Sequence, residues 1–149
     1  MSRSLSPWVT KLIALFLVFA LLTPSTASAA TVEPVMPYAS RYLTSYNTYI
    51  CDMGSGRIEI WFDVMGTGDM DEIGVLAIEL YEVNSNGSLT WIKTFLYEDY
   101  DTMLAYDDWS HTSCVSYQGS STKTYQAYVC IWAGKNGNGD TRYMWATMV

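Results

Sequence analysis

The stretch that decides the fold is RIEIWFDVM, residues 57–65. Apolar residues occupy every second position, at Ile58, Ile60, Phe62 and Val64, and the positions between them carry charged or aromatic residues. A period of two is typical of a β-strand that turns one face toward a hydrophobic core. We therefore predict a strand at 57–65 with its Ile/Phe/Val face buried.

Similar stretches recur on both sides of this strand, and turn residues separate them. The connections are a turn at residues 54–56, a break at 66–69, an Asn-Gly hairpin turn at 84–87, an acidic connection at 98–109 and a glycine-rich loop at 134–140. No segment shows a sustained helical period. The pattern predicts seven strands: Leu43–Cys51, Arg57–Met65, Ile73–Val83 (with Leu76, Ile78 and Leu80 on one face), Leu89–Tyr97, Thr112–Tyr117, Thr124–Trp132 and Arg142–Val149. Seven strands in about 110 residues suit an all-β, antiparallel, immunoglobulin-like sandwich.

The last third of the chain carries a more specific resemblance. The spacing Tyr125-x-Ala127-x-Val129, followed by Ala133-Gly134 and by Asn136-Gly137-x-Gly139, resembles the last two strands of a fibronectin type III domain. That resemblance implies that Tyr125 is the tyrosine that caps the corner before the sixth strand.

The first 30 residues differ in composition from the rest. Arg3 and Lys11 precede an apolar run at 12–22, and small residues follow up to Ala30. This order is typical of a secretory signal peptide, and the run is too short for the roughly 20 residues of a membrane-spanning helix. We predict a signal peptide at 1–30, cleaved after Ala29 or Ala30, an extended leader at 31–40 and a sandwich domain at 41–149. The protein is then secreted and not an integral membrane protein.

Removal of the predicted signal peptide makes the net charge of the chain more negative. Both charged residues in that segment are basic, so the net charge goes from −7 to −9. A nucleic-acid partner is disfavoured, because such proteins bind phosphates with an excess of Lys and Arg.

A second resemblance covers most of residues 38–149. It rests on Tyr42-Leu43-x-Ser45-Tyr46, Gly66-Thr67-Gly68-x-Met70-Asp71-x-Ile73-Gly74, Ser110-His111 and the Tyr125–Gly134 spacing. These motifs resemble a family of small exported proteins of Clostridia-like, Gram-positive bacteria that carries a domain of unknown function. The resemblance implies no catalytic residue and no ligand.

Residues that often carry chemistry form no catalytic motif. Strand parity turns Cys51, Cys114 and Cys130 outward, which leaves one disulfide or three unpaired thiols as alternatives. Asn136-x-Asn138-x-Asp140 has the spacing of the first calcium ligands of an EF-hand, but the later positions do not match, so solvated loop charge is the alternative to a calcium site. His111 stands beside Ser110 without an orienting acid. We assign no catalytic residue, cofactor or metal.

Aromatic side chains are the remaining candidates for a site. Parity places Tyr81, Tyr128 and Trp132 on the outer face of their strands, with Tyr143 and Trp145 as further candidates. Exposed aromatics on a sheet can form a protein interface or stack on sugar rings, although cross-strand aromatic pairs also stabilise sheets. We predict a non-enzymatic module that serves protein interaction or cell-surface association. The alternative is a carbohydrate-binding module that uses Tyr81, Tyr128 and Trp132.

Overall fold

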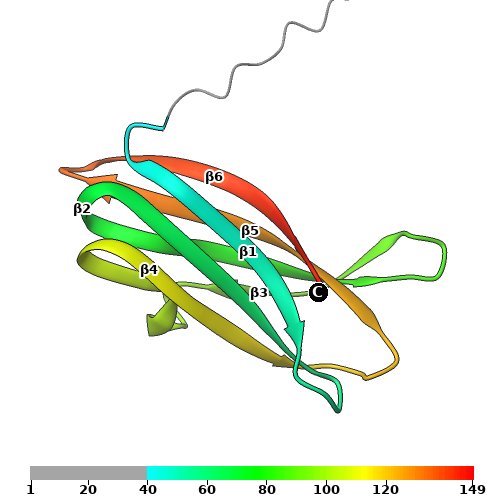
Figure 1. Cartoon of the computed structure of the whole chain (residues 1–149). Coiled ribbons are helices and arrows are strands. Elements are labelled where there is room, and N and C mark those ends of the chain that lie inside the picture. Colours follow the sequence, from blue (N-terminus) through cyan, green and yellow to red (C-terminus); the bar gives the residue numbers. More distant parts are fainter. Residues whose placement is uncertain (1–39) are drawn as a thin grey trace, which may run out of the picture. The chain divides into compact units, whose positions relative to one another are not determined.

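The computed structural model describes residues 40–149. The predicted signal peptide at 1–30 and all but the last residue of the predicted leader lie outside the described residues. The described part is all-β and antiparallel, with six strands: β1 (Leu43–Asp52), β2 (Arg57–Val83), β3 (Leu89–Leu96), β4 (Leu104–Gln118), β5 (Thr124–Lys135) and β6 (Asn138–Thr147) (Figure 1). A single 3-10 turn, η1 (Asp101–Met103), precedes β4. Residues 40–149 contain no helix of the length and hydropathy that a membrane crossing requires.

The long strand β2 organises the sheet. Its first half pairs with β1 on one side and with β4 on the other. Its second half pairs with β5, with β4 as far as Gly74 and with β3 from Ala77 onward. β6 pairs only with β5 along its length. The sheet curls so far that its edges β1 and β6 meet, where Ile50 and Met148 form a parallel bridge and the Val149 N–H donates to the Ile50 carbonyl over 3.0 Å.

The prediction of seven strands was wrong by one, because the break expected at residues 66–69 does not end the strand. β2 bends there at one end of the domain and runs back (Figure 1). Gly66 allows the bend, since a Cβ at this position would lie 2.9 Å from Cγ of the buried Met70. The Thr67 N–H still finds an acceptor, the Tyr42 carbonyl, at 2.9 Å. Two predicted strands are therefore one continuous strand of 27 residues.

Two predicted connections were also too long. The acidic connection expected at 98–109 ends at Met103, because Met103 and Leu104 are buried and β4 begins at Leu104, paired with Gly74 of β2. The loop expected at 134–140 shrinks to a tight turn at Asn136 and Gly137, whose φ angles of 53° and 72° are those of a two-residue hairpin turn. The flanking glycines belong to β5 and β6.

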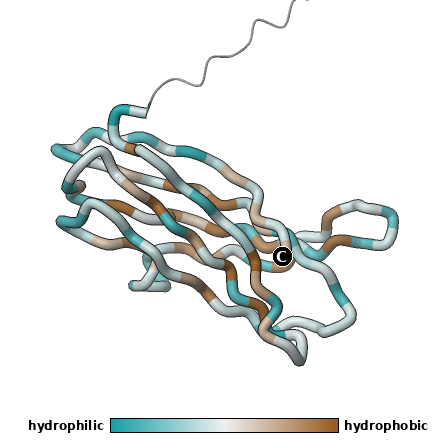
Figure 2. Tube along the Cα trace, in the orientation of Figure 1, coloured by the Kyte–Doolittle hydropathy of each residue, from teal (hydrophilic) through white to brown (hydrophobic). Residues whose placement is uncertain are grey.

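The buried face of the sheet agrees with the predicted parity. Ile58, Ile60, Phe62 and Val64 of β2 are buried, and so are Ala127, Val129 and Ile131 of β5. Both halves of β2 contribute to one hydrophobic cluster, and Figure 2 shows the most hydrophobic residues within the strands. One expectation was wrong. Leu76 does not share the buried face of Ile78 and Leu80, because the register shifts between Val75 and Ala77 and leaves Leu76 in a β-bulge.

Tyr125 occupies the corner that its sequence context predicts. It is the second residue of β5, its side chain is only 3% exposed, and its hydroxyl accepts the Ser120 N–H over 2.9 Å. A hydrogen bond between the hydroxyl of a buried tyrosine and the backbone a few residues upstream is the geometry of a tyrosine corner. Gly119 makes room for it, since a Cβ there would lie 2.4 Å from the Tyr125 hydroxyl oxygen.

Candidate functional site

Four aromatic side chains contact one another on the outer face of β2, β5 and β6. We call this set, Tyr81, Tyr128, Tyr143 and Trp145, the aromatic ledge. The sheet register brings it together, because Tyr128 pairs with Trp145 across β5 and β6. The Tyr128 ring lies 4.8 Å from the Trp145 ring and stacks on Tyr143 at 5.5 Å with an interplanar angle of 12°. Tyr81 extends the row, with its ring 5.7 Å from Trp145.

Solvent reaches the β6 side of the aromatic ledge most freely. Tyr143 is 60% exposed and Trp145 is 46% exposed, whereas Tyr81 and Tyr128 are half-buried. The Tyr81 hydroxyl donates to a Glu79 carboxylate oxygen over 2.5 Å, and this hydrogen bond raises the pKa of Tyr81. The phenol therefore stays neutral and held in place at physiological pH.

A cysteine lies within the same face. Cys130 pairs with Tyr143 across β5 and β6, and burial raises the pKa of the Cys130 thiol, although its hydrogen bond with Tyr143 partly offsets this effect. The neighbouring sulfur in turn raises the pKa of Tyr143. The thiol is therefore protonated at neutral pH, where it behaves as a small apolar group.

Trp132 does not join Tyr81 and Tyr128, although sequence parity puts all three on one face. It lies farther along β5, where its indole N–H donates to a Glu72 carboxylate oxygen over 3.1 Å. A Cβ at Gly134 or at Gly139 would lie 2.6 or 2.2 Å from atoms of its ring, so the indole covers the backbone of both glycines. Trp132 therefore belongs to a second location near the β5–β6 turn.

At this second location the surface is hollowed. A hollow of about 290 Å³ is lined by side chains that include Trp132, Tyr106, Glu72 and Asp71. Tyr106 could not be recognised as a site residue from the sequence, because the pattern predicts an acidic connection at 98–109. The spacing Trp132-x-Gly134, with Gly139 across the turn, was the available signal, because glycines on the outer face of a strand leave room for a ring to lie on the backbone.

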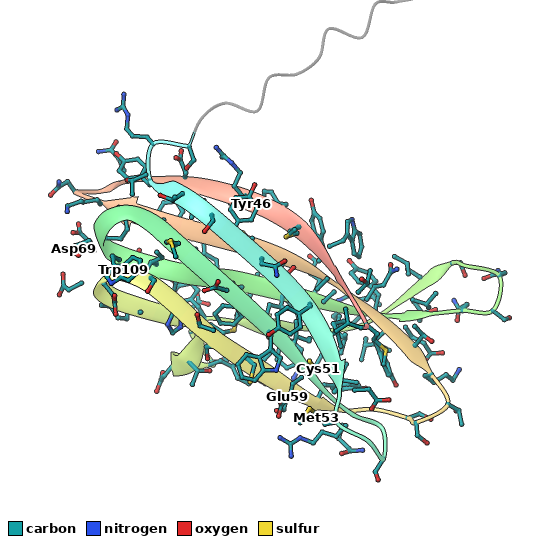
Figure 3. The ribbon with its side chains drawn as sticks, in the orientation of Figure 1. Tyr46, Cys51, Met53, Glu59, Asp69 and Trp109 are labelled. Atoms are coloured by element: carbon teal, nitrogen blue, oxygen red, sulfur yellow. The ribbon has the colours of Figure 1, made fainter. Side chains whose placement is uncertain are left out.

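The other outer face, on β1, β2 and β4, carries the remaining two cysteines. Cys51 lies opposite Glu59, as Figure 3 shows, and Cys114 lies opposite Trp61. All three cysteines of the described residues are unpaired and partly exposed, in agreement with the outward parity. Burial raises the pKa of the Cys114 thiol, and the nearby Glu59 carboxylate adds to this.

Glu59 is buried although its position in the alternation is an outer one. It is only 8% exposed, and it accepts hydrogen bonds from Arg57 over 2.6 Å and from the Trp61 indole over 3.2 Å. Its neighbours on the same strand therefore cover and neutralise this carboxylate. The arrangement stabilises the strand surface and presents no open acid.

Asp140, the last residue of the candidate calcium segment, makes hydrogen bonds to the start of the described chain. The Asp140 carboxylate accepts the Ser40 hydroxyl over 2.6 Å and the Arg41 and Tyr42 N–H groups over 2.7 and 3.1 Å. These hydrogen bonds lower the pKa of Asp140, and the one from Ser40 has the largest effect. The Asp140 carboxylate is thus engaged by residues 40–42, and residues 40–149 contain no cluster of three potential His, Cys, Asp or Glu metal ligands.

The lone histidine, His111, contacts the turn that precedes its own strand. His111 Nε2 lies 2.8 Å from the Thr102 carbonyl oxygen, and its ring packs beside Phe62 at 5.7 Å. This contact ties the middle of β4 to η1, the turn that precedes the strand.

Comparisons with known proteins leave the family open. No family model matches the chain, and no curated protein matches it. Among solved structures, the chain is similar to Spo0M, a sporulation control protein from Bacillus subtilis, with 8% sequence identity and a TM-score of 0.40. The match covers 70% of this chain and 48% of the Spo0M chain, so this chain spans about half of that protein's length.

Proposed function

We propose that this chain is a secreted, non-enzymatic β-sandwich module of the immunoglobulin or fibronectin type III kind, and that it binds a protein partner through the aromatic ledge at the cell surface. The tyrosine corner at Tyr125 supports the sandwich type, because this device is characteristic of such domains. The resemblance of the motifs at residues 42–46 and 66–74 to those of small exported proteins of Gram-positive bacteria supports the same assignment.

The observation that carries the proposal is the row of four rings on one sheet face, in which each ring contacts at least one other. Tyrosine and tryptophan dominate the energetics of protein interfaces, because they bury a large area and lose little conformational entropy. Trp145 and Tyr143 remain about half exposed, so a partner could still bury much of their surface. Their packing against Tyr128 and Tyr81 restricts the orientations that the two rings can take.

The geometry of the aromatic ledge favours a protein over a sugar as its ligand. Trp145 is tilted by 43° from Tyr128 and by 53° from Tyr81, so these rings do not form one flat platform for pyranose rings. An uneven apolar surface suits interdigitating side chains. The acidic charge of the chain favours a partner that surrounds its apolar centre with Lys and Arg, because complementary charge speeds association.

Site-specific photo-crosslinking on intact producing cells tests this proposal. A photoreactive phenylalanine analogue replaces Tyr143 on the aromatic ledge or, as the matched control, Tyr46 of β1, which is also solvent-exposed. We expect a discrete protein adduct from position 143 and none from position 46. The same adducts from both positions, or none from position 143, would contradict the proposal.

Export is tested separately by sequencing the N-terminus of the protein recovered outside the cells. Cleavage at the predicted signal-peptide site gives a chain that begins at Ala30 or Thr31. Recovery of the chain only inside cells, with Met1 intact, would refute the export part of the proposal.

A further inference from the structure

The hollow beside Trp132 has a chemistry different from that of the aromatic ledge. We propose that it binds one pyranose ring of a neutral saccharide, with Trp132 as the platform, Tyr106 as the wall, and Asp71 and Glu72 as the hydrogen-bonding groups. This site is independent of the aromatic ledge, because the two share no residue.

The platform is preformed. The indole of Trp132 covers the backbone of Gly134 and Gly139, and the bond from its N–H to Glu72 sets the rotation of the ring. One face of the indole is thus occupied by the protein, and the opposite face is left for a ligand. A fixed aromatic face suits the C–H face of a sugar ring, because little side-chain entropy is lost when the two surfaces meet.

The polar groups of the hollow are matched to hydroxyl groups. Asp71 accepts the Asn136 N–H over 2.6 Å through one carboxylate oxygen, and Glu72 accepts the Trp132 indole N–H through one of its own. Each carboxylate has a second oxygen with lone pairs that can accept a hydroxyl proton. Two carboxylates of fixed orientation, next to an aromatic platform, can therefore bind two hydroxyls at once.

Two further side chains keep these groups in position. Lys135 Nζ donates to the Asp69 carbonyl over 2.6 Å and ties the end of β5 to the bend of β2, and the Asn138 amide donates to the Asn136 carbonyl over 3.1 Å. The residues that line the hollow thus come from β2, β4, β5 and β6, which meet at this end of the sheet.

Size and charge restrict the ligand. A volume of about 290 Å³ is at the lower limit for small-molecule sites, so the hollow can hold a single sugar ring but not several linked rings. Two carboxylates, of Asp71 and Glu72, and one ammonium, of Lys135, line the hollow, and that ammonium already donates to the Asp69 carbonyl. The net negative charge disfavours the carboxylate of a uronic or sialic acid and also phosphate or sulfate groups. A neutral pyranose at the end of an oligosaccharide fits these limits.

The test is an NMR titration of the exported protein that follows the Trp132 indole N–H signal. The probes are the methyl glycosides of glucose, galactose, mannose and N-acetylglucosamine, each added to about 50 mM, a range that reveals millimolar dissociation constants. The charged control is the methyl glycoside of glucuronic acid. We expect saturable shifts with at least one neutral glycoside and none with the glucuronide.

Variants locate the site. Tyr106 is 61% exposed, so Tyr106→Ala removes the wall without removing core packing, and Glu72→Gln removes a charge but keeps an acceptor for the indole. We expect each to weaken binding about tenfold, while Trp145→Ala on the aromatic ledge changes it less than about twofold. Failure of all four neutral glycosides to bind would overturn the proposal, and so would binding that persists in both hollow variants or is lost in Trp145→Ala.

Discussion

Replacement of Tyr125 by phenylalanine removes one atom from the corner of β5 and leaves the ring in place. The hydroxyl accepts the Ser120 N–H over 2.9 Å, and the side chain is almost fully buried. Loss of a buried acceptor leaves the partner unsatisfied and costs about 1–3 kcal/mol. Ser120 is itself exposed, so water can reach its N–H group in part, and we expect the lower half of this range, about 1.5 kcal/mol.

The expected change in melting temperature follows from the size of the domain. An unfolding entropy of about 2.1 cal/mol/K per residue over about 110 residues amounts to roughly 0.23 kcal/mol/K. A loss of about 1.5 kcal/mol therefore lowers Tm by about 6 °C. Calorimetry measures Tm, and urea unfolding measures the free energy, with an unchanged m-value because the buried surface is the same.

Tyr117→Phe is the matched control for this experiment. Tyr117 packs edge-on against Tyr125, with ring centroids 5.9 Å apart, and is only half-buried. Its hydroxyl should contribute less than about 0.5 kcal/mol. The account of the corner would be refuted if Tyr125→Phe and Tyr117→Phe shifted Tm equally, or if Tyr125→Phe left it unchanged within about 1 °C.

Three further predictions follow from the contacts of single residues. The pKa of Asp140 is lowered in the folded state, so its stabilising effect is present above the unfolded pKa of about 3.9 and is lost as the pH falls through the folded value. Asp140→Asn should cost about 1 kcal/mol in urea unfolding at pH 7, and the difference should narrow below about pH 4. Gly139→Ala should cost about 1–3 kcal/mol, because its Cβ would lie 2.2 Å from Trp132, whereas Gly68→Ala, with open space around it, should be near neutral in the same assay. The raised pKa of Cys130 should make its alkylation by iodoacetamide at pH 7.5 slower in the folded protein than in urea, and equal rates by mass spectrometry would contradict this.

Local sequence pattern was sufficient for features that depend on one strand or one turn. The alternation at 57–65 predicted which side chains of β2 are buried, because burial of one face is a property of the strand itself. The Asn-Gly turn after β2 formed as expected, with Gly87 at a φ of 80°. The spacing around Tyr125 likewise predicted a tyrosine at the corner before β5, where its hydroxyl accepts the Ser120 N–H.

Features that depend on partners from distant parts of the chain could not be predicted from the sequence. Gly66 and Gly68 predict the end of a strand, but hydrogen bonds with neighbouring segments continue β2 through the bend. Leu104 opens a strand inside an acidic segment because Met103 beside it is buried in the core. Pattern alone cannot detect such tertiary effects.

The candidate sites show the same limit. Sequence parity correctly turned Trp132 outward, but parity does not state how far apart residues of one face lie along a strand. Trp132 therefore shares its surroundings with Tyr106, from β4, and not with Tyr81 or Tyr128. The aromatic ledge depends on Trp145, which pairs with Tyr128 only through the register of β5 and β6.

Binding of a protein partner by the aromatic ledge is measured through the affinity of Trp145→Ala for the protein crosslinked through position 143. The matched control is Trp109→Ala on β4, since Trp109 is also about half exposed. We predict that Trp145→Ala raises Kd at least about thirtyfold, as expected for an interface hot spot of 2 kcal/mol or more, and that Trp109→Ala changes it less than about twofold. Equal affinities of the wild-type chain and Trp145→Ala would contradict the account.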